Sequence, residues 1–233
     1  MASILHLETS TKICSVALSR DGSILFSKVD MNGPSHAVQI GLFVDEALKV
    51  AESKGLRLDA VAVSSGPGSY TGLRIGVSMA KGLCYGAGVR LISIPTLRLL
   101  ADQVIRKAGF PKDALICPML DARRMEVYTA TFDAQGHYLE KDKALIVDEN
   151  SFTEALKNHP VWFVGDGAEK CRKKIQSDHA HFDRNVFPLA EAMMPLAEKA
   201  FSENKFENVA YFEPFYLKEF VATISKKQII PTK

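Results

Sequence analysis

The chain has 233 residues and is nearly neutral, with 29 Lys and Arg against 27 Asp and Glu. Its 47% hydrophobic and 24% charged residues are typical of a globular protein with one large core or two smaller lobes. The densest basic cluster, 172–174, has only three residues, which argues against a protein that grips nucleic acid alone. The sequence leaves open whether the chain contributes to an RNA-binding surface that it shares with another protein.

The N-terminus and the cysteines indicate the compartment. MASILHLETSTK has only a short apolar run and no basic leader, so we do not expect a signal peptide, and no apolar run is long enough for a membrane span. The cysteines lie in or beside apolar segments and form no C-x-x-C pair, which predicts buried, reduced thiols. They are Cys14, Cys84, Cys117 and Cys171. We therefore expect a cytoplasmic protein without membrane contact.

Three strand-like runs open the chain, at residues 4–7, 14–18 and 24–29, and predict an antiparallel meander. Apolar residues then recur at helical spacing between Ile40 and Ala51, so a helix is predicted over 35–53 with Ser35 as its N-cap. The remaining elements of this half follow in order. They are a strand at 61–63, a helix at 70–85, a strand at 91–94 and a helix reaching Lys107.

After Pro111 this order partly repeats. The predicted elements are strands at 114–120, 125–132 and 161–164 and a helix at 151–158. Two lobes, each opening with a meander, fit this pattern better than one parallel sheet. We place the boundary between residues 98 and 99, with the C-terminal segment free to pack back on the first lobe. The polar stretch with His179 and His181 is expected to be a surface loop, and residues 225–233 to be loose.

The stretch 59–88 combines a strand, a glycine turn and a helix, which is a unit that presents backbone N–H groups to anions. It matches neither the Walker A pattern nor G-x-G-x-x-G, because Thr71 stands where each needs glycine. Gly66 and Gly68 are therefore favoured as residues that only shape the turn.

Small residues recur every fourth position on the predicted helix and leave one face nearly flat. They are Gly72, Gly76, Ala80 and Cys84. Such a face packs either on the protein's own sheet or on a partner's helix.

Several polar turns are candidates for ligand contacts, each with a plainer alternative. Residues 8–11 could position a phosphate or a water, or form a solvated turn. The turn 165–167 could approach a nucleotide closely because glycine lacks Cβ. The corner 121–124 could hold a cleft residue or a salt bridge. The candidate nucleotide-binding residues are Glu8, Thr9, Ser10, Thr11, Gly165 and Gly167.

No catalytic residue and no metal site is predicted. His36 opens a helix, but Gln39 and Ile40 occupy the positions where a second ligand would share its face. The serines beside glycine do not form G-x-S-x-G.

Five segments together resemble one family, and they appear in the family's order. They read ILHLETST, GPGSYTGLRIGVSMAKGL, LDARRMEVY, VGDGA and PFYLKEF, and they span residues 4–220. The chain resembles the TsaB (YeaZ) family of bacterial proteins required for threonylcarbamoyladenosine formation in tRNA.

The resemblance implies an α/β protein with the two-lobed fold of actin, sugar kinases and heat-shock ATPases, in which mixed sheets are flanked by helices. It implies a non-catalytic scaffold subunit that binds and activates a TsaD-type transferase and recruits a TsaE-type ATPase. The transferase holds a metal through H-x-x-x-H, and Ile40 stands here at the second histidine's position. tRNA is expected only as part of the complex. No cofactor is firmly implied, and ATP or ADP at the partner interface stays open.

The resemblance also places the partner interface on the first two long helices, which pair with TsaD or, when the chain is alone, with a second copy. The implied interface residues are Ser35, His36, Ile40, Phe43, Tyr70, Thr71, Gly72, Arg74, Gly76 and Ala80. We expect Gly76→Leu to weaken this complex without unfolding the chain. The alternative is a stand-alone nucleotide-binding ATPase or kinase of the same fold. Glu8 stands where the family usually has aspartate, which weakens the case for a phosphate contact.

Overall fold

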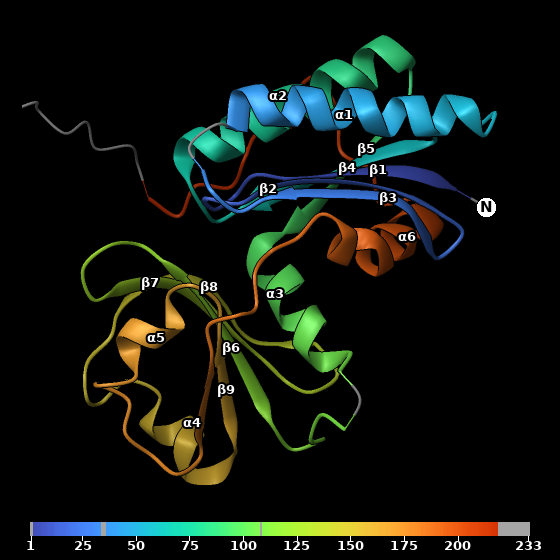
Figure 1. Ribbon diagram of the computed structural model, residues 1–233. Coiled ribbons are helices and arrows are strands. Elements are labelled where there is room, and N and C mark those ends of the chain that lie inside the picture. Colours follow the sequence, from blue (N-terminus) through green and yellow to red (C-terminus); the bar gives the residue numbers. More distant parts are fainter. Residues whose placement is uncertain (1, 34–35, 108, 219–233) are drawn as a thin grey trace, which may run out of the picture.

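The computed structural model describes residues 2–33, 36–107 and 109–218, and these form two lobes, each built on a five-stranded sheet (Figure 1). The first sheet has the order β3-β2-β1-β4-β5. Its strands are β1 (Ser3–Glu8), β2 (Cys14–Arg20), β3 (Ser23–Asp30), β4 (Ala60–Gly66) and β5 (Arg90–Pro95). The sheet is mixed because β1 pairs antiparallel with β2 and parallel with β4.

The second sheet repeats this arrangement in the order β10-β9-β6-β7-β8. Its strands are β6 (Leu115–Asp121), β7 (Glu126–Phe132), β8 (Tyr138–Ile146), β9 (Val161–Val164) and β10 (Ala180–Asp183). Here β6 takes the central place of β1, antiparallel to β7 and parallel to β9. The expected fold class, an α/β protein of two lobes with mixed sheets flanked by helices, is confirmed.

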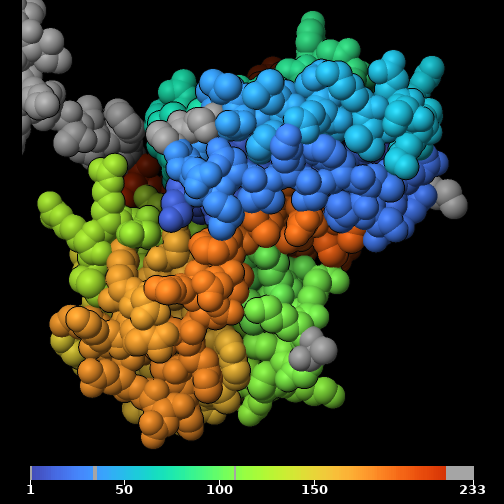
Figure 2. Space-filling view, viewed as in Figure 1, coloured from blue at the N-terminus to red at the C-terminus, as the bar shows by residue number. Residues whose placement is uncertain are grey.

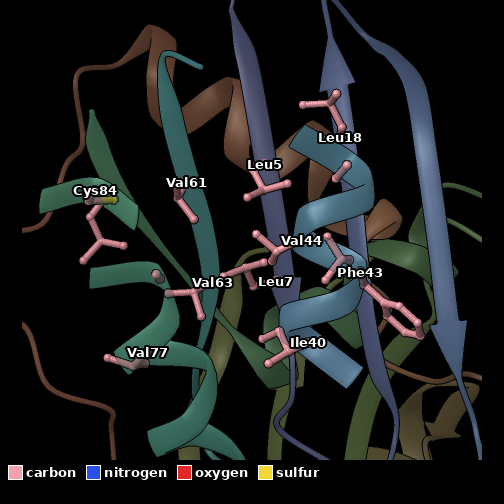
Figure 3. Packing of buried hydrophobic residues seen from close by; sticks show 14 of the residues in the cluster. Leu5, Leu7, Leu18, Ile40, Phe43, Val44, Val61, Val63, Val77 and Cys84 are labelled. Carbon is pink, nitrogen blue, oxygen red and sulfur yellow. The ribbon is translucent and has the colours of Figure 1, made fainter. Parts of the chain in front are cut away.

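Two long helices, α1 (His36–Ser53) and α2 (Tyr70–Ala87), cover one face of the first sheet (Figure 1). Their apolar faces meet alternate side chains of the central strands in one core (Figure 3). The core includes Leu5, Leu7, Ile40, Val44, Val63 and Val77. Ser69 caps α2 by accepting from the Gly72 N–H, and Gly88 ends it with a left-handed φ of 66°.

The opposite face of the first sheet is covered by elements from both ends of the second half. These are α3 (Thr96–Ile105), a short 3₁₀ turn η1 (Glu191–Met193) and α6 (Met194–Ser202). Met193 and Ala197 pack with Ile4 and Ile92, so the chain returns to the first lobe after completing the second (Figure 2). The predicted boundary between residues 98 and 99 falls inside α3.

After α6, residues 206–218 form what we call the C-terminal strap. It runs beside β5, where the Glu207 N–H donates to the Leu91 carbonyl at 2.8 Å, and then past the end of β4, where the Phe215 N–H donates to the Ser65 carbonyl at 2.7 Å. The predicted loose tail, 225–233, lies outside the described residues.

The second lobe carries two short helices, α4 (Thr153–Asn158) and α5 (Ala168–Cys171). The prediction of a surface loop is confirmed for His179, which lies in an exposed turn, but is wrong for His181, because residues 180–183 form β10, an edge strand parallel to β9. His181 is part of that strand, and its ring stacks on Trp162 with the centroids 4.2 Å apart. A short edge strand with one solvated face shows too few apolar residues to be recognised from sequence.

All four cysteines are free and buried, as predicted. Burial raises the pKa of the Cys14 and Cys117 thiols to about 12. No helix among the residues that the structure describes is long and apolar enough to cross a membrane.

Candidate functional site

The outer face of α1 and α2 carries an open groove of about 690 Å³, which we call the helix groove. Its lining is mostly apolar and comes from both helices. The lining residues are Ala37, Ile40, Tyr70, Thr71, Arg74, Ile75, Ser78, Met79, Gly82 and Leu83. On α1, Val38 is also 65% exposed. Exposed apolar surface concentrated on two helices is characteristic of a protein–protein interface.

Four of the predicted interface residues line this groove, namely Ile40, Tyr70, Thr71 and Arg74. Tyr70 is half-buried at the start of α2, and the guanidinium of Arg74 lies over its ring, 5.5 Å from the centroid. Thr71, beside Tyr70, is exposed. These side chains are available to a partner.

The stripe of small residues faces inward instead. Gly72 and Gly76 press against Thr9, and an added Cβ at either position would clash with an oxygen of that residue. Thr9 in turn donates its hydroxyl to the Gly72 carbonyl at 2.7 Å. The stripe therefore packs on the protein's own sheet together with the buried Ala80. The expectation that Gly76→Leu leaves the fold intact is consequently wrong.

The predicted residues on α1 are also largely interior. His36 is buried, and its Nε2 lies 2.7 Å from the Thr11 carbonyl. Phe43 belongs to the core, while Ile40 is fully buried beneath the floor of the helix groove. Ser35 lies outside the described residues.

Sequence reasoning missed the apolar wall of the groove. Ile75, Met79 and Leu83 recur every four residues on α2 and are half-buried. Beside them Ser78 and Gly82 are exposed, and a Cβ added at Gly82 would meet nothing within 4 Å. The same four-residue spacing that drew attention to the buried glycines could have revealed this wall.

A second hollow, the inter-lobe cleft, has a volume of about 840 Å³. It lies where the carboxyl ends of β1 and β4 face the end of β6. Its walls include Ser10, Thr11, Lys12, Gly68, Ser69, Asp121, Arg123, Tyr128 and Asp166. The C-terminal strap forms part of its lining through Phe215, Tyr216 and Lys218.

Glu8 does not reach this cleft. Its side chain is completely buried, and its Oε1 accepts from the Ser10 N–H at 2.5 Å while its Oε2 has no hydrogen-bond partner among the described residues. Burial raises the pKa of this carboxyl to about 7, although the bond from Ser10 lowers it. Glu8 is therefore a buried acid under the first turn.

Of the other candidate nucleotide-binding residues, some line the cleft and some do not. Ser10 and Thr11 line the cleft, whereas Thr9 is fully buried. Gly165 and Gly167 pack on the backbone of β6, and Asp166 between them lines the cleft. Burial also raises the pKa of the Asp166 carboxyl.

The corner after β6 combines both of its predicted roles. Asp121 lines the cleft, and its Oδ1 accepts from Lys170 Nζ at 2.5 Å and from the Arg123 N–H at 2.7 Å. Lys170 also donates to the Glu126 carbonyl at 2.6 Å. Asp121 is thus both a cleft residue and a salt-bridged corner.

Comparison with known proteins shows to which family the chain belongs. Residues 31–226 match a family model described as TsaD: tRNA N6-adenosine threonylcarbamoyltransferase. The tRNA threonylcarbamoyladenosine biosynthesis protein TsaB of Bacillus subtilis is 30% identical over 74% of this chain and 75% of that protein. The chain belongs to the TsaB family. The TsaB of Escherichia coli is 29% identical over 94% of this chain and 96% of its own length.

A solved TsaB-type structure agrees with this placement. YeaZ from Pseudomonas aeruginosa superposes with a TM-score of 0.79 at 26% identity, covering 93% of this chain and all of that one. A tRNA N6-adenosine threonylcarbamoyltransferase of Geobacillus kaustophilus is 30% identical over 48% of this chain but only 38% of that enzyme. The TsaB of Escherichia coli therefore matches nearly the whole chain, whereas this transferase matches about half of it.

Proposed function

We propose that this chain is a non-catalytic subunit in the biosynthesis of threonylcarbamoyladenosine in tRNA, and that it binds and activates a TsaD-type transferase through the helix groove. TsaB-family membership supports the pathway. The groove, with its half-buried Ile75, Met79 and Leu83, supports the docking face and is the observation that carries the proposal. A role in tRNA modification also implies a cytoplasmic location.

The described residues favour chemistry on another chain. They contain no group of three His, Cys, Asp or Glu placed to hold a metal ion. His36 is engaged with the Thr11 carbonyl, and Glu8 is sealed from the cleft. The competing function, a nucleotide hydrolase or kinase dependent on Glu8, is therefore less well supported.

The docking proposal is tested with Ser78→Arg, which places a large cation in the groove at an exposed helix position. Ile146→Arg is the matched control, because Ile146 is 71% exposed on β8 of the other lobe. Gel filtration with the cognate TsaD-type protein should show a complex for the wild type and the control only. Equal binding by Ser78→Arg would contradict the groove as the docking face.

The activation proposal is tested by reconstitution with the cognate transferase, the adenylate-forming enzyme, a TsaE-type ATPase, ATP, threonine, bicarbonate and unmodified tRNA. We expect modification to require this chain and to fail with Ser78→Arg. ATP turnover by the chain alone, lost in Glu8→Gln, would favour the enzymatic alternative.

Without its partner, the chain is expected to use the same groove to pair with a second copy. Sedimentation should then give a dimer for the wild type and a monomer for Ser78→Arg. TsaE recruitment belongs to the same proposal, and omission of the TsaE-type ATPase from the reconstitution tests it. A nucleotide at the partner interface also belongs to it, and binding of labelled ADP to the preformed complex tests that part.

A further inference from the structure

Two consecutive arginines at the mouth of the inter-lobe cleft adopt a backbone conformation that L-residues rarely take. In the turn from β6 to β7, φ is 72° at Arg123 and 49° at Arg124. This left-handed region is usually occupied by Gly, Asn or Asp, because Cβ crowds the following carbonyl. A turn that only joined two strands would favour those residues. An outlier of this kind is a reason to look for a function.

The surrounding carboxylates hold this turn through its backbone. Asp121 accepts from the Arg123 N–H, and the Oδ1 of Asp166 accepts from the Asp121 N–H at 3.0 Å. The Ala122 N–H donates to the Glu126 carbonyl at 3.1 Å, which closes the turn. These contacts fix the backbone of the turn and involve neither guanidinium group.

Both guanidinium groups lack an acidic partner among the described residues, and both side chains are exposed. The neighbouring lysines are paired, Lys170 with Asp121 and Lys218 with Glu126, each at 2.5 Å. Arg123 also lines the cleft. The turn thus presents two positive charges that no carboxylate of the described residues neutralises.

The chemistry of the guanidinium group and the residues that line the cleft indicate which ligand these charges bind. A guanidinium binds phosphate oxygens through paired N–H donors, and Arg is well suited to this contact. Tyr128 lines the same cleft and offers aromatic surface on which an unpaired base can stack. The net charge of +2 suits a protein that supplies a few phosphate contacts to a larger RNA surface.

We propose that Arg123 and Arg124 bind the phosphate backbone of the tRNA in the assembled complex, where the RNA passes the mouth of the inter-lobe cleft. This inference rests on the proposed function, since it needs tRNA to be the substrate of the complex. It adds an RNA contact on this chain, in the turn between β6 and β7 and not on the two long helices.

The test is the double variant Arg123→Gly/Arg124→Gly in the complex with the cognate transferase. Glycine suits both φ values, so the variant should fold, keep its thermal midpoint and bind the transferase like the wild type. Affinity for an unmodified tRNA transcript is measured by fluorescence anisotropy over a series of salt concentrations. We expect about tenfold weaker binding near 0.1 M salt and a slope of log affinity against log salt that is smaller by about one to two.

Two further variants complete the design. Arg57→Gly removes an exposed guanidinium that precedes β4, at the end of the strand opposite the cleft, and should leave tRNA affinity and salt slope unchanged. Arg123→Lys/Arg124→Lys keeps both charges and should retain the slope while losing part of the affinity. Wild-type affinity and slope in the glycine variant, or an equal loss in Arg57→Gly, would overturn the inference. Full modification without the chain would instead overturn the proposed function, which the reconstitution reads out separately.

Discussion

The ring of Tyr216 packs on the ring of Tyr70, with their centroids 4.8 Å apart, and fastens the C-terminal strap to the start of α2. Tyr70 lines both the helix groove and the inter-lobe cleft. One side chain thus links the proposed docking face, the strap and the cleft.

Tyr216→Ala should loosen the strap locally. An aromatic pair contributes about 1 kcal/mol beyond its buried area, so the exchange of the Phe215 amide hydrogen, bonded to the Ser65 carbonyl, should accelerate roughly fivefold. Hydrogen exchange by mass spectrometry over 206–218 checks this. Tyr211→Ala is the control, since Tyr211 is 83% exposed. Equal protection in both variants would contradict a fastening role for Tyr216.

Glycines on the two faces of α2 should respond in opposite directions to alanine. Gly76→Ala places a methyl against the Thr9 hydroxyl and should lower the free energy of unfolding by about 1–3 kcal/mol. Gly82→Ala meets open space and should raise it by up to about 1 kcal/mol through helix propensity. Urea titrations compare the two variants with the wild type. A stabilising Gly76→Ala would show that α2 does not pack this closely on the first turn.

Glu8 should make the protein less stable as the pH rises. Burial raises its pKa from 4.5 to about 7 in the folded state, so between these pH values the folded state keeps a proton that the unfolded state has lost. The stability contributed by this neutral carboxyl is complete below pH 4.5 and is lost as the pH approaches 7. His6, on the same strand, acts oppositely. Burial lowers its pKa from 6.5 to about 3, so its contribution is lost as the pH falls below 6.5.

Glu8→Gln separates these two effects. Between pH 4.5 and 6.5 they offset each other in the wild type, whereas in the variant stability should rise with pH because only His6 remains. The difference in unfolding free energy between variant and wild type should change by about 3 kcal/mol in favour of the variant from pH 4.5 to pH 7. Chemical denaturation at several pH values measures it. Parallel profiles for the two proteins would mean that Glu8 titrates like an exposed carboxyl.

The cysteines should be inert in the native state. Burial raises the pKa of all four thiols, to about 11 for Cys84 and higher for Cys14, so thiolate is scarce and access is blocked. An aromatic disulfide reagent at pH 8 should label none of them before unfolding and all four afterwards. Gly82→Cys, on the open face of α2, should react at once and serves as the reference. Rapid labelling of the native wild type would show that the cores open readily.

Much of the fold was predictable because its apolar runs carry clear periodicity. The meander over 4–29, the helix beginning near His36 and the glycine-ended helix over 70–85 all have strong local signals. Local pattern could not decide which way a small residue faces, because glycine has no side chain to reveal burial. The sequence could not show that a Cβ added at Gly76 would meet Thr9 whereas one added at Gly82 would meet nothing within 4 Å.

The position of Glu8 was unpredictable for a related reason. Every residue of β1 is buried, so the strand lacks the alternation of polar and apolar residues that assigns side chains to a face. The C-terminal segment was expected to be free to pack back on the first lobe, but the path of the strap could not be predicted, because its order comes from contacts with distant partners such as Leu91 and Ser65. Its own sequence has no helical or strand period.

The packing of α6 on the first sheet has a consequence for synthesis on the ribosome. Ile4, Ala62 and Ile92 are made early, yet two residues that cover them, Met193 and Ala197, follow more than a hundred positions later. While the second lobe emerges, the apolar face of the first sheet that α6 later covers is exposed to solvent. Newborn chains halted before residue 190 should therefore be clients of chaperones that bind exposed apolar segments, and release should coincide with the appearance of α6.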